Sequence, residues 1–514
     1  MKNYLNSNPQ VQLNQKFDYF NLTPLIILLW SLISFAFMPI IPIASGFGWD
    51  GVFYGKVVMN FQNMIGNIDG YHSTRIFPAV LIHYILTLLD LPLDLKSALL
   101  GYRIYNIIIL VGSSIFWVLI AKRLSLNLLA KWIGFVALFI NYPMLNLHFY
   151  YPALTDGTAF FIGIIMMYSY LNKNNILLLF VTAICFFCWP AGVVIGFIFF
   201  IYSNTESKIF YKSKKTPIYL FILLLSPFLS LIGLNFAGEI KNLIVQSGLD
   251  GVLFRKFNYP GSYKPLNWHY LINAILNGFY LVIVFWYILR NFDILKFIRF
   301  NFKQVVLTKL FISILIVVIL VTVKGFIYSS DLKTLSPFGY FSNFFTGINV
   351  RFPLQFIFCH IVYWGPIIIL FIMFFKDFIA YLQKFSLPIM LGFLFTVLFS
   401  INSEGRPIIN FYPFIVVVLL QAVDFSKLRN KKLFMIIFIF VSLLYSKVWL
   451  LIKLPSSVFP ESIYTDLDKF PMQWYFMNFG LFTNTLMYWL HASVAVILFL
   501  SFYFIVKQLK QRKY

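Results

Sequence analysis

Apolar runs of about twenty residues recur along the whole chain, beginning with Pro24–Ala44. An α-helix of roughly that length crosses the ~30 Å hydrocarbon core of a membrane, because each residue adds about 1.5 Å. The chain has few charged residues that could form a water-exposed surface around these runs, since 61% of the 514 residues are hydrophobic and 11% are charged. This balance excludes a soluble globular protein. The sequence therefore predicts an all-α polytopic membrane protein.

The apolar runs predict about 14 transmembrane helices, within a range of about 12–14. Asn175–Ser203 is too long for one span and contains Pro190, so we expect two short helices there, meeting at Trp189-Pro190-Ala191-Gly192. A single crossing would place the lysines that follow on the outer face, against the positive-inside bias. The other expected spans are Pro24–Ala44, Ala98–Ile120, Leu128–Leu147, Asp156–Leu171, Pro217–Ala237, Trp268–Leu289, Leu310–Tyr328, Pro353–Phe375, Leu387–Ile401, Pro407–Ala422, Leu433–Ile452 and Leu481–Val506.

The expected spans divide the chain into two tails and two membrane modules. A cytoplasmic tail, 1–23, precedes a first transmembrane module, 24–237, whose first outer loop covers 45–97. A second transmembrane module, 238–506, carries further outer loops, and 507–514 form a basic cytoplasmic tail.

The first outer loop carries the strongest candidate for chemistry, Asp50, within Gly48-Trp49-Asp50-Gly51-Val52-Phe53-Tyr54. A carboxylate just past a spanning helix can stay ionised in interfacial water, and aromatic residues suit the headgroup level. An ordinary Asp-Gly turn with an aromatic belt explains the same residues equally well. Later in the loop, Ile76–Leu89 is apolar but short and is flanked by charges, which is typical of an interfacial helix.

The net charge of +23 would favour a nucleic-acid partner in a soluble chain. Here Lys and Arg gather on the expected inner side, so the surplus reflects topology and contact with anionic membrane lipids, and we expect no nucleic acid. The six histidines show no paired spacing of metal ligands. We expect neither a metal nor another cofactor.

Five short motifs, in their order and on one expected side of the membrane, resemble the integral-membrane glycosyltransferases of the C type. The first is most similar to the mannosyltransferases that build glycosylphosphatidylinositol anchors and to their bacterial relatives. The resemblance covers about residues 20–205 with ordered motifs and the rest mainly by hydropathy, and a basic residue common beside the fourth motif is absent. The motifs are Trp49-Asp50-Gly51-Val52-Phe53-Tyr54, Arg75-Ile76-Phe77-Pro78, Tyr151-Pro152-Ala153-Leu154-Thr155-Asp156-Gly157, Trp189-Pro190-Ala191-Gly192 and Ser403-Glu404-Gly405-Arg406-Pro407.

This resemblance implies an enzyme that takes a sugar from a polyprenyl-phosphate or dolichyl-phosphate carrier and passes it to a glycan or lipid-linked acceptor at the outer face. It places the enzyme in a bacterial inner membrane rather than the endoplasmic reticulum. Asp50 matches the first acidic motif and is the implied general base. Asp156 matches the second and is the other expected catalytic residue, which binds the acceptor sugar or shares the role of base. The chemistry agrees, because such a transfer develops positive charge at the anomeric carbon and needs the acceptor hydroxyl deprotonated.

Substrate binding requires cations that stabilise the departing phosphate, and polar or aromatic groups that hold the sugars. Plainer explanations remain: an Arg at a helix end can be an interface anchor, His72 an ordinary interface residue, and Asp156 a helix cap. The expected substrate-binding residues are Tyr54, His72, Arg75, Arg255, Lys256, Arg351 and Arg406.

Two other classes of membrane protein fit the same hydropathy. A polysaccharide or lipid flippase or transporter would carry intramembrane charges or repeated halves with broken helices, whereas this chain shows no internal repeat. An envelope-glycan polymerase or ligase would present its key groups in one large late loop, whereas the acidic motifs here come early.

Overall fold

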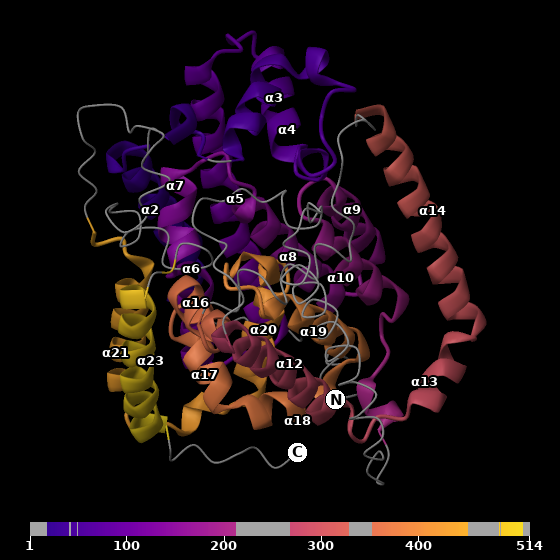
Figure 1. Ribbon diagram of the computed structural model, residues 1–514, viewed down its shortest axis with the longest axis vertical. Helices are drawn as coiled ribbons and strands as arrows, with labels where there is room; N and C mark the ends of the chain where they lie inside the picture. The colour runs from indigo at the N-terminus through magenta and orange to yellow at the C-terminus, as the bar shows by residue number, and fades with distance from the viewer. Residues whose placement is uncertain are drawn as a thin grey trace, which may run out of the picture.

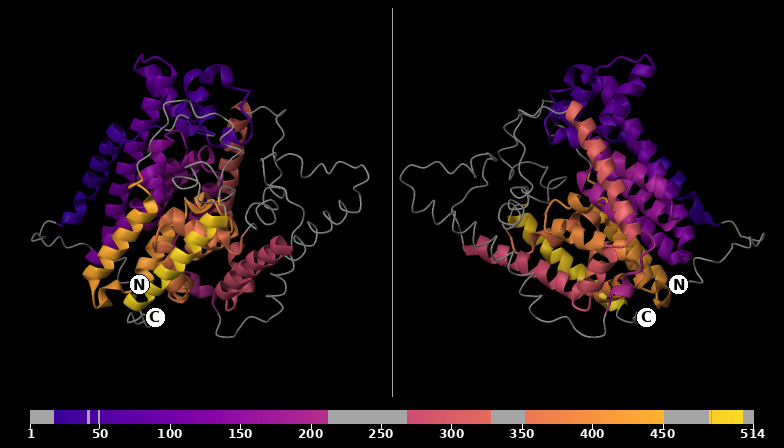
Figure 2. Two further views of the ribbon diagram at one scale, coloured as in Figure 1. Left: turned by 60° about the vertical axis from the view of Figure 1, so that its left-hand side comes forward. Right: turned by 90° about the vertical axis from the view of Figure 1, so that its right-hand side faces the viewer.

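The computed structural model describes residues 18–40, 43–48, 50–211, 268–327, 352–450, 483 and 485–506. These residues form helices and connecting turns, and no β-strand occurs among them. The ribbon views show the helices gathered into one bundle (Figures 1 and 2).

The described residues up to 211 contribute the first half of the bundle. In chain order their helices are η1 (Tyr19–Leu22), α2 (Thr23–Phe37), η2 (Ile43–Gly46), α3 (Gly51–Met64), η3 (His72–Thr74), α4 (Phe77–Leu88), α5 (Leu95–Arg123), α6 (Leu128–Phe139), η4 (Pro143–Leu147), α7 (His148–Tyr150), α8 (Asp156–Leu171), α9 (Asn175–Phe186), α10 (Pro190–Ile201) and η5 (Ser207–Phe210).

The described residues from 268 onward contribute the second half. Their helices are α12 (Trp268–Leu289), α13 (Ile294–Asn301), α14 (Gln304–Ile327), α16 (Gln355–Trp364), α17 (Ile367–Met373), α18 (Phe375–Phe385), α19 (Leu387–Ser400), η7 (Arg406–Ile408), α20 (Tyr412–Ala422), η8 (Phe425–Lys427), α21 (Lys431–Ser446) and α23 (Thr485–Val506).

Local sequence explains many helix ends. The Asp94 carboxylate accepts the amide of Ser97 at 2.8 Å and so caps α5, whose last turn carries Lys122 and Arg123. Asn127 caps α6 in the same way by accepting the amide of Ala130. These polar caps fix where one apolar helix ends and the next begins, which apolar composition alone does not show.

Helix α5 is the longest of the described helices, with 29 residues, and packs against both α2 and α8. The Arg103 guanidinium on α5 donates to the carbonyl of Phe35 on α2, which ties the first two long helices together. Helices α3 and α4 pack on each other and lie at one end of the bundle, called here the α3–α4 end (top of Figure 1). Helices α13 and α18 lie toward the opposite end of the bundle.

The structure confirms the two short helices expected around Pro190. Helix α9 ends at Phe186 and α10 starts at Pro190. A Cβ added at Gly192 would meet the Cys185 thiol, and one added at Gly196 would meet Thr182, so the contacts run in opposite directions along the two helices. The helices therefore form an antiparallel hairpin, because residues farther from the turn on one helix face residues farther from the turn on the other.

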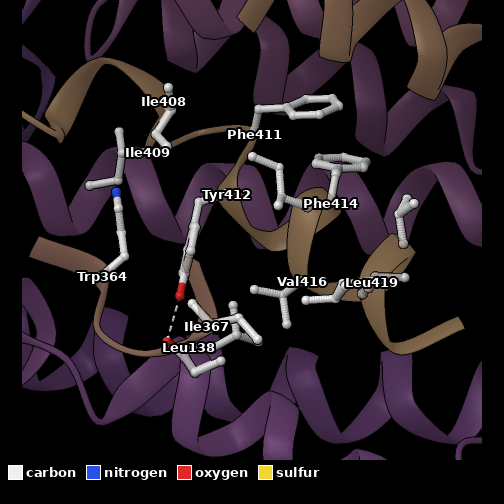
Figure 3. Packing of buried hydrophobic residues seen from close by; sticks show 14 of the residues in the cluster. Leu138, Trp364, Ile367, Ile408, Ile409, Phe411, Tyr412, Phe414, Val416 and Leu419 are labelled. Atoms are coloured by element: carbon white, nitrogen blue, oxygen red, sulfur yellow. Dashed lines mark hydrogen bonds between the residues drawn. The ribbon is translucent and has the colours of Figure 1, made fainter. Parts of the chain in front are cut away.

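One apolar core joins the two halves of the chain. The rings of Trp364 and Tyr412 stack with centroids 3.8 Å apart, and the Tyr412 hydroxyl donates to the carbonyl of Ala137 on α6 at 2.8 Å (Figure 3). Helix α20 packs on both α6 and α8. The module boundary expected at residue 237 lies outside the described residues, and the helices on both sides of it share this core.

The expected number of about 14 spans is not confirmed. Among the described helices, four are long and apolar enough to cross a membrane, and α6 with the bent η4–α7 segment, at an angle of 54°, would make a fifth. The expected span Pro353–Phe375 is broken at Gly365-Pro366 into α16 and α17, since a proline removes a backbone donor. Asp156–Leu171 and Trp268–Leu289 have the expected bounds, and Pro217–Ala237 lies outside the described residues.

Candidate functional site

Asp50 stands at the start of helix α3, not in the middle of a free turn. Its side chain does not cap the helix, and instead its Oδ2 atom accepts a 2.8 Å hydrogen bond from the hydroxyl of Tyr71. Burial and the nearby Asp50 carboxylate raise the pKa of Tyr71 above its ordinary value, although Arg75 lowers it. Tyr71 is therefore a neutral hydrogen-bond donor at neutral pH. It orients the Asp50 carboxylate and leaves that group negatively charged.

The turn before Tyr71 holds His72 in a defined orientation. One oxygen of Asp69 accepts the amides of Tyr71 and His72, both at 2.9 Å, and the other lies 2.5 Å from His72 Nδ1. The ring of Phe53 stacks on the imidazole with centroids 4.1 Å apart, and the ring of Tyr54 lies edge-on at 5.6 Å. Because Asp69 occupies Nδ1, the other ring nitrogen, Nε2, is the one available to a ligand.

Arg75 lies between two aromatic rings. Its guanidinium carbon is 4.5 Å from the ring centroid of Tyr71 and 4.4 Å from that of Trp189, at the turn of the α9–α10 hairpin. Within the described part of the chain its guanidinium forms no ion pair. Arg75 is thus held by stacking, and its hydrogen-bond donors are left for another group.

Asp156 begins α8 and is fully buried, with 0% of its side chain exposed. Its two oxygens accept from Nε and the terminal guanidinium nitrogen of Arg406 at 2.8 and 2.9 Å, and the Tyr363 hydroxyl donates to one of them at 3.0 Å. Such a bidentate pair fixes both partners in position. The sequence predicted both residues as site residues and did not predict that they bind each other.

Contacts connect these groups in one series from Asp50 to Asp156. Tyr71 binds Asp50, Arg75 lies on Tyr71 and on Trp189, and the Arg406 guanidinium lies 5.9 Å from the same Trp189 ring. We call the six residues Asp50, Tyr71, Arg75, Trp189, Arg406 and Asp156 the acidic–basic series.

Close backbone packing brings the two acidic motifs together. Gly48 has a left-handed φ of 71°, and a Cβ there would overlap the ring of Tyr151. A Cβ on Gly51 would come within 3.1 Å of Ala153. Glycine at these positions lets the start of α3 approach the turn that leads into Asp156.

Of the expected substrate-binding residues, Tyr54, His72, Arg75 and Arg406 lie in or beside the acidic–basic series. Tyr54 is buried, and its pKa is raised, mainly by burial. Arg255, Lys256 and Arg351 lie outside the described residues.

Sequence reasoning missed Tyr71, Asp69, Trp189, Tyr363 and Glu404 as members of the site. Burial raises the pKa of the Glu404 carboxyl, although Arg406 and Arg75 lower it. The sequence did contain a signal for Tyr71 and Asp69, because Asp69-Gly70-Tyr71-His72 groups a carboxylate, a phenol and an imidazole in four residues. Nothing local marks Tyr363, whose partner is 207 residues away. In the described ranges, no three His, Cys, Asp or Glu side chains are grouped so that they could hold a metal ion.

In the part of the chain that the structure describes, the fold and the site define an all-helical protein with four or five candidate membrane spans and a partly buried acidic–basic series near one end of its helix bundle. No family model matches the chain, and neither a curated protein nor a solved structure matches it.

Proposed function

We propose that this protein is a membrane glycosyltransferase that moves a sugar from a polyprenyl-phosphate carrier to a glycan or lipid-linked acceptor. The observation that carries the proposal is the series of contacts from Asp50 through Tyr71 to Arg75, because it sets a carboxylate near a cation that forms no ion pair with any described residue. Sugar transfer from a lipid phosphate needs those two groups side by side, one for the acceptor proton and one for the phosphate.

In the proposed reaction, Asp50 takes the proton from the acceptor hydroxyl as its oxygen attacks the anomeric carbon. The bond from that carbon to the phosphate oxygen breaks, and the carrier leaves with the bonding electron pair. Arg75 stabilises the departing phosphate through its guanidinium donors, which the stacking rings of Tyr71 and Trp189 leave available. His72 lies beside Tyr71, the partner of Asp50, and Tyr54 lies edge-on to His72, so these two residues would contact the sugars.

The bidentate Asp156–Arg406 pair supports separate roles for Asp50 and Asp156, whereas the sequence led us to expect that both could be catalytic. Asp156 already accepts three hydrogen bonds, from Arg406 and Tyr363, so its lone pairs are largely used. From the described residues, the Asp50 carboxylate accepts one hydrogen bond, donated by Tyr71. We therefore assign proton transfer to Asp50, and to Asp156 the positioning of Arg406 beside Trp189.

The proposal extends to the membrane. Several described helices are shorter than a full span, and we propose that they cross as bent or paired segments, which would bring the total to about 12–14 crossings. A bacterial inner membrane, with the α3–α4 end outward, would present the acidic–basic series to a carrier whose chain stays in the bilayer.

The test is turnover by the purified full-length protein with polyprenyl-phosphate sugars, followed as loss of sugar from the carrier when acceptor lipid is present. Wild type should release sugar, and Asp50→Asn should lose about 10²–10⁴-fold in rate, the usual contribution of a general base. Asp90→Asn is the matched control, since Asp90 is an exposed carboxylate in the same loop, and it should keep the wild-type rate.

Retention of more than about a tenth of the rate in Asp50→Asn would contradict its role as the base. Movement of a lipid across proteoliposome membranes, without loss of sugar from any carrier, would support a flippase or transporter instead. Lengthening of an acceptor glycan by whole repeat units would support a polymerase or ligase.

A further inference from the structure

Lys447 is a buried lysine close to the acidic–basic series, and no residue that the structure describes gives its side chain a polar partner. Lys447 directly follows α21 and adopts a left-handed backbone with φ of 58°. The carbonyl before it, on Ser446, accepts a 3.1 Å hydrogen bond from Asn146 Nδ2, which fixes the end of α21 against η4. Lys447 is turned inward, and only 5% of the residue is exposed.

Within the described part of the chain, the Lys447 Nζ atom has no hydrogen-bond partner. The Nζ atom lies 5.4 Å from the centroid of the Tyr142 ring, and the ammonium group interacts electrostatically with the titratable side chains of Cys359 and His491. A tyrosine face offsets only part of the cost of burying an ammonium group, whereas an anion bound to it would offset far more.

Aromatic rings connect Lys447 to the candidate site. The Tyr142 ring that faces Lys447 has its centroid 5.9 Å from the ring of Tyr363. Tyr363 in turn donates its hydroxyl to Asp156, the partner of Arg406. Lys447 and Arg75 therefore approach the Asp156–Arg406 pair from different elements, one from the end of α21 and the other from the loop before α4.

We propose that Lys447 anchors a second anion subsite, and that the group it binds is the phosphate of a lipid-linked substrate. This inference rests on the proposed function and deepens it. Among the residues that the structure describes, Arg75 and Lys447 both lack a carboxylate partner, and contacts connect each of them to the Asp156–Arg406 pair from a different side chain. Two phosphate subsites imply that donor and acceptor are both lipid phosphates, since a lipid phosphate drawn into the protein without a cation would be costly to desolvate.

The experiment counts lipids bound to the purified full-length protein by native mass spectrometry, with a polyprenyl phosphate as the probe. Wild type should bind two. Lys447→Met, which keeps the length of the side chain and removes the charge, should bind one, with about tenfold or greater loss of affinity at the second subsite. Lys447→Arg should keep both. Lys431→Met is the matched control, because Lys431 is an exposed lysine at the other end of the same helix, and it should bind two.

Two further probes identify the source of the phosphate. The uncharged polyprenol should not bind at the Lys447-dependent subsite, and inorganic phosphate should not displace the lipid at equal concentration. Displacement of the lipid by inorganic phosphate at equal concentration would show that the subsite binds free phosphate, and would overturn the proposal that it binds a lipid phosphate. Two lipids bound by Lys447→Met would overturn the subsite itself, and Lys447→Gln provides the same comparison if the methionine variant does not fold.

The outcome is separable from that of the proposed function. Asp50→Asn should bind two lipids like wild type, since Asp50 contacts neither proposed phosphate group. Lys447-dependent binding without sugar transfer from any carrier would support the subsite and overturn the glycosyltransferase proposal alone. Sugar transfer by a protein that binds a single lipid, with an affinity that Lys447→Met does not change, would support the glycosyltransferase proposal and overturn the subsite.

Discussion

Arg406 and Asp156 form a two-point ion pair although 250 residues separate them in the chain. The pair joins η7 to the first residue of α8, so it connects the two halves of the bundle at the candidate site. Tyr363 adds a third hydrogen bond from α16. Three helical elements therefore meet at one buried carboxylate.

Breaking that pair should be costly. Arg406→Ala leaves the Asp156 charge buried without its partner, which typically costs about 3–5 kcal/mol, and removing both charges together in Asp156→Leu/Arg406→Leu should cost less. Thermal unfolding of the purified variants checks the order. Lys208→Met, which breaks the exposed pair with Glu206, is the control and should change stability by about 0–1 kcal/mol. A similar small loss for Arg406→Ala would show that the pair is not fixed in place.

Gly48 and Gly66 provide a matched test of the packing between the two acidic motifs. Both have left-handed backbones, with φ of 71° and 82°, so alanine at either should cost about 1–2 kcal/mol of backbone strain. A Cβ at Gly66 meets nothing within 4 Å, whereas one at Gly48 overlaps Tyr151. We expect Gly48→Ala to lower both stability and sugar transfer well beyond Gly66→Ala. Equal effects would mean that the start of α3 does not rest on Tyr151.

The Asp69 turn should weaken in acid. Burial raises the pKa of Asp69, but hydrogen bonds from the His72 amide and imidazole lower that pKa. Together the lowering effects outweigh burial, so the net shift of the pKa is downward. A carboxyl with a depressed folded pKa stabilises the protein above its unfolded pKa, near 3.9, and this stability is lost as pH falls through the folded pKa. The melting temperatures of wild type and Asp69→Asn should therefore differ at pH 7, and the difference should shrink as the pH falls below about 4 toward the folded pKa of Asp69.

Asp90→Asn serves as the control for that measurement, because Asp90 is exposed. Its melting temperature should follow that of wild type at every pH. A gap between wild type and Asp69→Asn that stays constant down to pH 3 would show that the Asp69 charge does not support the turn.

The α9–α10 hairpin predicts which residues share one side of the membrane. Single cysteines at Asn172, before α9, and Lys208, after α10, should react with an impermeant thiol reagent from the same side, because both positions are exposed and the hairpin returns the chain. Asn67→Cys at the α3–α4 end should react from the opposite side. The native cysteines Cys185, Cys188 and Cys359 are buried and should give little background. Labelling of Asn172→Cys and Lys208→Cys from opposite sides would mean a single crossing.

Sequence alone determined the features that depend on neighbouring residues. Apolar composition predicted a helical chain with membrane spans, Pro190 predicted the break between α9 and α10, and α8 starts at Asp156 as expected. These features follow from helix length, backbone donors and polar caps, which act within a few residues. The order of the acidic motifs also placed Asp50 and Asp156 in the candidate set.

Only the tertiary structure decided how those residues are used. It made Asp50 the start of a helix, paired Asp156 with Arg406, and left Arg75 between Tyr71 and Trp189. It also broke runs that hydropathy had counted as single spans. The reason is physical: hydropathy reports whether a segment prefers an apolar surrounding, whereas the partner of a charged side chain depends on how helices hundreds of residues apart pack around it.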